Sequence, residues 1–176
     1  MKNFRILLTA STGFISRAIM WFTKSPYSHS AIAFELEGRQ MVVGADANGF
    51  VMQSRERFLR HNRIVRTWQF FGALDRPATK QWLLDFLDEP YDYLGLFSGV
   101  LMMVKRRIFS RWGWASKKSP NPTHSQNALF CSEACVYLLR AACFPGASEL
   151  DPDGTTPQDL DEWLSAVAGS VCIEPE

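Results

Sequence analysis

The sequence is short of several features that would place it outside ordinary globular proteins. It has four cysteines and three histidines among 176 residues, and the cysteines lack the paired spacing of a zinc ribbon or a disulfide scaffold. The longest apolar run, residues 93–104, is too short to cross a bilayer as a helix. These shortages argue against a disulfide-held miniprotein, a cysteine-rich metal domain and a transmembrane helix.

An excess of charge of one sign is also lacking, because the formal net charge is only +1. The charges are nevertheless unevenly placed. All 19 Lys and Arg residues lie within residues 1–140, and every charged residue within 141–176 is an Asp or a Glu. This asymmetry fits either a basic face for an anionic partner or an acidic segment that docks on a basic body. The arginines lack an accompanying recognition motif, so we expect no nucleic-acid partner.

Apolar residues are plentiful, at 47% of the chain with 13% aromatic, which is enough to bury a sizeable core. We therefore expect residues 1–176 to form a single domain. The N-terminus lacks the pattern of a secretory signal, so we expect a cytoplasmic protein. Trp112 and Trp114 follow the basic residues Lys105, Arg106, Arg107 and Arg111. This segment fits either a weak peripheral contact with anionic membrane or a solvated loop.

Hydrophobic periodicity predicts alternating strands and helices. Strand patterns cover residues 4–9, 28–36, 40–46, 49–53 and 64–70, and helical patterns cover 14–22, 77–87 and 131–142, with another helix starting at 157. The arginine-rich residues 54–66 read as a solvated connection. The expected architecture is an α+β fold.

Cys131 stands at the predicted start of a helix, where the positive helix end stabilises a thiolate. A nucleophilic cysteine also needs an imidazole partner on a rigid element. His29 is the histidine within a clear strand pattern, and its predicted strand face also carries Ala31 and Ala33, small enough for a helix to pack closely. Cys131 and His29 are therefore the candidate catalytic pair.

A third polar group usually orients such an imidazole. Asp46 is the nearest acid in the adjacent predicted strand, while Glu35 shares the predicted His29 face but lies six residues away. The same residues also fit a noncatalytic interpretation, in which His29 is a structural strand residue and Cys131 is inert packing.

Four motifs, in this order, give the chain a resemblance to a known family. They are residues 25–32 (SPYSHSAI), residues 91–92 (YD), residues 130–133 (FCSE) and residues 156–160 (TPQDL). The chain resembles the circularly permuted papain-like cysteine hydrolases of the NlpC superfamily, in the bacterial YiiX-like branch related to lecithin retinol acyltransferase. The resemblance spans most of the chain.

This resemblance implies a permuted papain-like (NlpC-type) fold, in which a catalytic helix packs on an antiparallel sheet. It also implies a nucleophile at Cys131 and a general base at His29, and the permutation accounts for a His that precedes the Cys. Many relatives carry an acid in the next strand at the position that Gly44 occupies here. Asp46, two residues on and on the same predicted strand face, is the candidate replacement.

The expected activity is that of a cysteine hydrolase, of the amidase or peptidase type, acting on an amide or ester through a thiolate acyl-enzyme. Backbone N–H groups beginning with Cys131 are the expected oxyanion donors, with the Tyr27 hydroxyl as an additional one. No metal or organic cofactor is expected, and the expected substrate is a small peptide, amide or lipid ester. Two alternatives remain open: a lipid-directed thiol acyltransferase or hydrolase at a membrane, and a noncatalytic binding module. The oligomeric state is not predicted.

Overall fold

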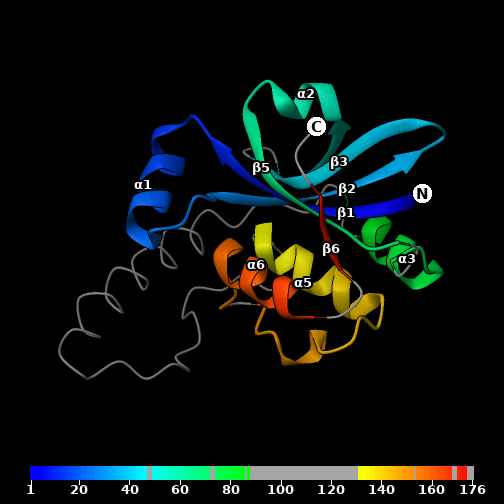
Figure 1. Cartoon of the computed structure of the whole chain (residues 1–176). Coiled ribbons are helices and arrows are strands. Elements are labelled where there is room, and N and C mark those ends of the chain that lie inside the picture. Colours follow the sequence, from blue (N-terminus) through cyan, green and yellow to red (C-terminus); the bar gives the residue numbers. More distant parts are fainter. Residues whose placement is uncertain are drawn as a thin grey trace.

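Six antiparallel strands form one sheet with helices on both sides, in a computed structural model that describes residues 1–46, 49–71, 74–85, 87, 131–152, 154–167 and 170–173 (Figure 1). The strands are β1 (Lys2–Ser11), β2 (His29–Leu36), β3 (Arg39–Asp46), β4 (Gly49–Ser54), β5 (Asn62–Gln69) and β6 (Val171–Ile173). The helices are α1 (Phe14–Thr23), α2 (Arg55–Leu59), α3 (Pro77–Asp85), α5 (Cys131–Ala141) and α6 (Pro157–Ala166), with a 3-10 turn at Ala147–Glu149.

The strand order is β4-β3-β2-β1-β5-β6, so the N-terminal strand and β2 are central. Thr9 of β1 pairs with His29 of β2, and Leu8 pairs with Ser30. On the other side of β1, the register with β5 shifts between Leu8 and Thr9. This irregularity therefore lies one strand away from His29, and bulges of this kind commonly adjust the direction of side chains beside functional sites.

One face of the sheet, here called the α5 face, carries the main core. Its strand residues include Ile6, Leu8, Ile32, Phe34 and Val43, and they pack with the buried side chains of α5 and α6. Cys135, Leu138 and Leu139 of α5 are 0% exposed, as are Leu160 and Leu164 of α6. The stripe predicted from the sequence is thus the buried face of α5, because residues three and four apart share one side of a helix.

The opposite face, here called the α2 face, carries a smaller cluster. Phe58 of α2 packs there with apolar side chains of the sheet: Leu7, Ala31, Ala33, Val42 and Ile64. Figure 1 shows α2 on one side of the sheet and α5 with α6 on the other. The sheet is therefore buried on both sides around its two central strands.

The expectation of a solvated connection over residues 54–66 holds for the exposure of most of these residues, but it is wrong about their structure, because they form α2 and the start of β5. Ser54 accepts a hydrogen bond from the Arg57 amide at 3.3 Å and begins α2, and Phe58 is only 2% exposed. The strand that follows starts at Asn62, two residues before the predicted start. One apolar residue among arginines is enough to dock this short helix, because the other side chains point to solvent.

The helix predicted from residue 157 begins as expected. Thr156 and Asp159 form a reciprocal capping box, with the Thr156 hydroxyl accepting from the Asp159 amide at 3.1 Å and the Asp159 carboxylate accepting from the Thr156 amide at 2.9 Å. Nearby, the Ser132 hydroxyl donates to the Thr155 carbonyl at 2.6 Å. This bond joins the first turn of α5 to the segment that leads into α6.

The α+β class with an antiparallel sheet and a helix packed on it is confirmed. Across the ranges that the structure describes, no helix has the length and apolar character needed to cross a membrane. Residues 91–130, which include one quoted motif, the apolar run at 93–104, Trp112, Trp114 and His124, lie outside the described residues. The membrane contact expected from that segment stays a prediction.

Candidate active site

The two residues predicted as a catalytic pair come together in the structure. Cys131 is the first residue of α5 and His29 is the first residue of β2. The thiol of Cys131 lies within hydrogen-bonding range of the His29 imidazole and of the Ser30 amide and hydroxyl. Cys131 and His29, 102 positions apart in the chain, thus meet where the start of α5 lies beside the start of the central strand β2.

The electrostatic setting of Cys131 favours its thiolate. Burial by itself raises the pKa of this thiol, but the charge of His29, with hydrogen bonds from His29 and Ser30, outweighs burial and lowers the pKa to about 7. Cys131 is nevertheless partly exposed. A lowered thiol pKa on a residue that is not fully buried meets the two requirements for a reactive cysteine.

Cys135, one turn further along α5, has the opposite character. It is completely buried, and this burial raises the pKa of its thiol to about 12, with a further rise from Cys131 that a Ser30 hydrogen bond partly opposes. Cys143 and Cys172 are exposed. Cys131 therefore differs from Cys135 in combining a lowered pKa with an imidazole partner.

Ser30 lies between the two thiols of α5. Its hydroxyl is fully buried and has no partner of ordinary hydrogen-bond geometry among the described residues, but it faces Cys131 and Cys135 and lowers the pKa of both. Ser30 points to the α5 face because side chains alternate along a strand. Sequence analysis did not single out Ser30, although its position beside His29 was the available signal.

His29 belongs to the α2 face, and this corrects the packing argument made from the sequence. Ala31 and Ala33 share that face, but they pack under Phe58 of α2 instead of under the cysteine helix. The imidazole centroid of His29 lies 6.4 Å from that of the Phe58 ring. Cys131 reaches His29 because the first residue of α5 lies beside the first residue of β2. Small residues that admit a helix over the strand are not the reason.

Gly44 lies directly beneath the imidazole. A Cβ atom at this position would lie 3.2 Å from Nε2 of His29 and 3.3 Å from the Cβ of Ala31. Both distances are shorter than ordinary van der Waals contact, so a side chain here would displace the ring. The residue that departs from the family pattern therefore provides the space that the His29 ring occupies.

The predicted third residue, Asp46, is placed only through its backbone. The last paired residues of β2 and β3 at this end of the sheet are Ile32 and Val43. His29 lies three residues before Ile32 and Asp46 lies three residues after Val43, so the two are at the same level in neighbouring strands. The side chain of Asp46 lies outside the described residues, so its role as an orienting acid stays a prediction. Glu35 is engaged elsewhere, with Lys2 at 3.2 Å and with the Asn3 side-chain amide at 3.1 Å.

Tyr27 is buried, and its hydroxyl donates to a carboxylate oxygen of Asp161 at 2.8 Å. Burial raises the pKa of Tyr27 to about 12, and the bond to Asp161 contributes to this rise. A tyrosine has one O–H proton, so donation to an oxyanion would require the bond to Asp161 to break. The oxyanion role of Tyr27 stays a prediction.

Asp161 also accepts hydrogen bonds from Arg66 at 2.6 Å and from the Trp68 indole at 2.8 Å. This buried carboxylate thereby joins α6 to β5 and, through Tyr27, to the segment leading into β2. Sequence analysis missed the cluster, because Asp161 reads as a polar position on an amphipathic helix. The only local signal was that Arg66 and Trp68 lie two residues apart in one strand and therefore share one side of it.

Two comparisons with known proteins give no match: no protein-family model fits the chain, and no curated protein is similar to it. Solved structures do match. One is a crystal structure described as that of the metalloprotein YiiX from Escherichia coli O157:H7, with the family designation DUF1105. The match has a TM-score of 0.63 and 14% sequence identity, and it covers 99% of this chain and 97% of that chain.

The protein therefore has a YiiX-like α+β fold, which agrees with the branch that the sequence motifs indicated. At 14% identity the likeness shows the fold alone. The YiiX protein is described as a metalloprotein, so we asked whether this chain offers metal ligands. Within the described residues, no three His, Cys, Asp or Glu side chains gather closely enough to hold a metal ion, and the pair of Cys131 and His29 falls short of the usual number of ligands.

Proposed function

We propose that the protein is a permuted papain-like cysteine hydrolase, acting on an amide or ester through a thiolate acyl-enzyme. One observation carries the proposal: the thiol of the partly exposed residue Cys131 lies beside the His29 imidazole, which lowers the pKa of this thiol to about 7. A cysteine with such a lowered pKa forms its nucleophilic thiolate more readily near neutral pH than an ordinary cysteine does.

The proposed reaction has two steps. His29 takes the Cys131 proton, and the thiolate attacks the substrate carbonyl carbon to form a C–S bond. The C–N or C–O bond then breaks, and His29 returns the proton to the leaving amine or alcohol. In the second step, water gives a proton to His29 and attacks the thioester carbonyl carbon. The C–S bond then breaks, the carboxylic acid leaves, and His29 returns its proton to the sulfur, which restores the Cys131 thiol.

The negative carbonyl oxygen formed in each step needs hydrogen-bond donors. The backbone N–H of Cys131 at the start of α5 is the proposed donor, because the first amides of a helix have no acceptor within the helix. Asp46 is the proposed orienting group for His29. Its level in β3, matching that of His29 in β2, supports this assignment.

A noncatalytic binding module is the second candidate, and Gly44 is the observation that favours it, because the carboxylate of many relatives is missing at that position. The lowered pKa of Cys131 argues against it, because a module that only binds has no need of an activated thiol. The lipid-directed alternative uses the same pair of residues and differs only in its substrate.

Alkylation of the full chain by limiting iodoacetamide, from about pH 5 to about pH 9, tests the reactive pair. Cys131 should be labelled first, with a rate midpoint near pH 7, and His29→Ala should move that midpoint upward because only the Ser30 hydrogen bonds then oppose burial. His61→Ala is the matched control, since His61 lies in the turn before β5. Preferential labelling of Cys143 or Cys172 would count against a Cys131 nucleophile.

Chemistry is tested separately with an activated ester, p-nitrophenyl butyrate. The wild-type chain should release p-nitrophenol in a burst that matches the protein concentration, and mass spectrometry should find the butyryl group on Cys131. Cys131→Ala and His29→Ala should abolish the burst while keeping the wild-type circular dichroism. If alkylation behaves as expected but neither burst nor adduct forms, the noncatalytic module is the better description.

A further inference from the structure

The hydroxyl of Ser30 is a polar group inside an apolar core. Ser30 is fully buried, and its Oγ atom makes no hydrogen bond of ordinary geometry to any described residue. Its partner in β1 is Leu8, which is itself fully buried in the main core. A hydroxyl in such surroundings is costly unless it has a partner. An alanine would fill the position without this cost, so packing alone does not account for the hydroxyl.

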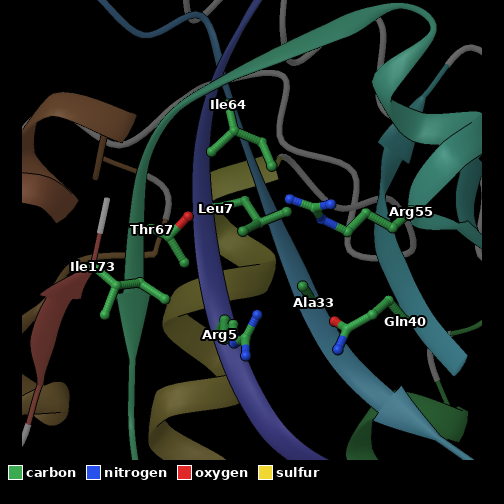
Figure 2. A pocket seen from close by; sticks show the side chains of 8 residues that line it. All are labelled: Arg5, Leu7, Ala33, Gln40, Arg55, Ile64, Thr67 and Ile173. Atoms are coloured by element: carbon green, nitrogen blue, oxygen red, sulfur yellow. The ribbon is translucent and has the colours of Figure 1, made fainter. Parts of the chain in front are cut away.

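Ser30 points to the side of the sheet on which α5 packs. Side chains alternate along a strand, and Ala31 and Ala33 belong to the α2 face. Figure 2 views the sheet from that face and shows the Ala33 side chain in front of the strands, with the α5 ribbon behind them. The Ser30 hydroxyl therefore faces α5, where Cys131 and Cys135 lie one turn apart on the same side of the helix.

The backbone of Ser30 lies just beyond the ladder between β2 and β3, whose last residue in β2 is Ile32. Leu36 and Arg39 flank the two-residue turn of this hairpin, so every second residue counted back from Leu36 turns its N–H and C=O toward β3. Ser30 belongs to this series but has no pair among the residues that the structure describes in β3. Its N–H donates to the Cys131 sulfur instead.

The hydroxyl of Ser30 contacts both thiols of α5, and each contact lowers the pKa of the thiol. A neutral thiol is a weak hydrogen-bond partner, whereas a thiolate is charged and accepts strongly. The hydroxyl has a single proton to donate. Cys135 stays neutral, because burial raises its pKa to about 12. The proton of Ser30 therefore goes to Cys131 when that thiol ionises, and the Cys135 S–H is free to donate to the Ser30 oxygen.

We propose that Ser30 is a positioning residue that holds the Cys131 thiolate with two donors, its backbone N–H and its hydroxyl, while the neutral Cys135 thiol donates to the oxygen of that hydroxyl. Both donors bond more strongly to the thiolate than to the thiol, so they favour the ionised form. They also fix the sulfur beside the His29 imidazole. This inference rests on the proposed function, in which the Cys131 thiolate is the nucleophile.

His29 and the two thiols are the titratable groups that act on these sulfur atoms among the described residues. The charge of His29 in β2 lowers the pKa of Cys131, and the charge of Cys131 raises the pKa of Cys135. Ser30 itself does not titrate, so replacing it changes the hydrogen bonding without changing the charge of the site. A shift in the ionisation of Cys131 on this replacement can therefore be assigned to the lost hydroxyl.

Ser30→Ala tests the hydroxyl, because it removes the Oγ atom and leaves the backbone N–H. The measurement is the alkylation of Cys131 in the full chain by limiting iodoacetamide, mapped by mass spectrometry as a function of pH. We expect the midpoint to rise by about half a pH unit or more, which lowers the rate near pH 6 about threefold. Near pH 9 the rate should match that of the wild type, since the thiol is then ionised in both chains.

Thr79→Val is the matched control. Thr79 also has a fully buried hydroxyl without a hydrogen-bond partner among the described residues, but it lies on α3. Its labelling profile should overlie that of the wild type. Ser30→Thr keeps a hydroxyl at the position and should also retain the wild-type midpoint. Circular dichroism of each variant shows that the fold is kept.

Cys135→Ala tests the second thiol. Its effect passes through the Ser30 hydroxyl, so it should raise the Cys131 midpoint by less than Ser30→Ala does. In a chain that already carries Ser30→Ala, it should add no further shift. A wild-type midpoint in Cys135→Ala, or an equal shift with and without Ser30→Ala, would remove Cys135 from the proposal.

A wild-type midpoint in Ser30→Ala would overturn the role of Ser30. A rate loss of the same size at every pH would overturn it too, because that pattern indicates a structural defect instead of a change in ionisation. Both results are distinct from failure of the proposed function. That failure would appear in the wild-type chain itself, as no preferential labelling of Cys131 or no butyryl adduct, and it would remove this inference with it.

Discussion

Nε2 of His29 lies over Gly44, at 3.2 Å from the point where a side chain would begin. The imidazole therefore borders the space into which a side chain at residue 44 would extend. Because the same ring lowers the pKa of Cys131, the absence of a side chain at residue 44 bears directly on the reactivity of the thiol.

Gly44→Ala should reduce the reactivity of Cys131. The added methyl group would press on the His29 ring, which has to move by a few tenths of an ångström. Weaker coupling between imidazole and thiol lets burial dominate, so the pKa of Cys131 should rise above about 7 and alkylation at neutral pH should slow about threefold or more. The rate of iodoacetamide labelling as a function of pH measures this shift.

Gly13→Ala is the control for that substitution, because a Cβ at Gly13 would meet only the Ser11 hydroxyl, at 3.9 Å. It should leave the labelling midpoint where the wild type has it. An unchanged midpoint in Gly44→Ala, with a folded protein, would show that the His29 ring tolerates the methyl group and that Gly44 does not govern the pair.

The lowered pKa of Cys131 predicts how stability depends on pH. Between about pH 7 and about pH 9, the folded chain has released the Cys131 proton and the unfolded chain has not. The unfolded state then binds more protons, so the free energy of unfolding rises with pH across this window. Below about pH 7 the contribution is lost. Urea titrations of wild type and Cys131→Ala at several pH values measure the difference, which should widen toward pH 9.

Cys143→Ala provides the comparison for these titrations, because Cys143 is exposed and lies outside the pair. A Cys131→Ala difference that stays constant, or narrows as pH rises, would be incompatible with a stabilised thiolate.

Asp161→Asn should destabilise the fold by roughly 2–4 kcal/mol, because a buried carboxylate that accepts from three side chains loses its charge. Glu162→Gln, on the exposed side of the same helix, should change stability by less than about 0.5 kcal/mol. Urea unfolding followed by tryptophan fluorescence gives both values. The pKa of Tyr27 should also fall from about 12, since the bond to Asp161 helps to raise it. Equal stabilities of the two variants would mean that the Asp161 cluster adds little.

Asp46→Asn should lower the burst with p-nitrophenyl butyrate about tenfold or more if the carboxylate orients His29, while stability changes little. Asp75→Asn is the matched control, because Asp75 is an acid that lies outside β3. A wild-type burst from Asp46→Asn would remove Asp46 from the mechanism and leave Cys131 and His29 as a dyad.

Much of the local structure was predictable because local physics decides it. The alternation of residues 28–36 predicted β2, and the stripe through Cys135, Leu138 and Leu139 predicted the buried side of α5. Thr156 and Asp159 predicted the start of α6, because a capping box satisfies free backbone groups within four residues. The placement of Cys131 at a helix start follows from the same periodicity.

The sequence by itself determined most of the elements, though not α2 or β6, and the identity of the candidate pair, because these depend on neighbours along the chain. Which face each helix covers was decided only by the tertiary structure. Strand β2 is apolar on both sides, with Ile32 and Phe34 on one and Ala31 and Ala33 on the other, and such a pattern does not say which side receives α5. The contact of His29 with Gly44 and the Asp161 cluster likewise join residues distant in sequence. Packing and charge create these relationships once the strands are in register, and no local pattern encodes them.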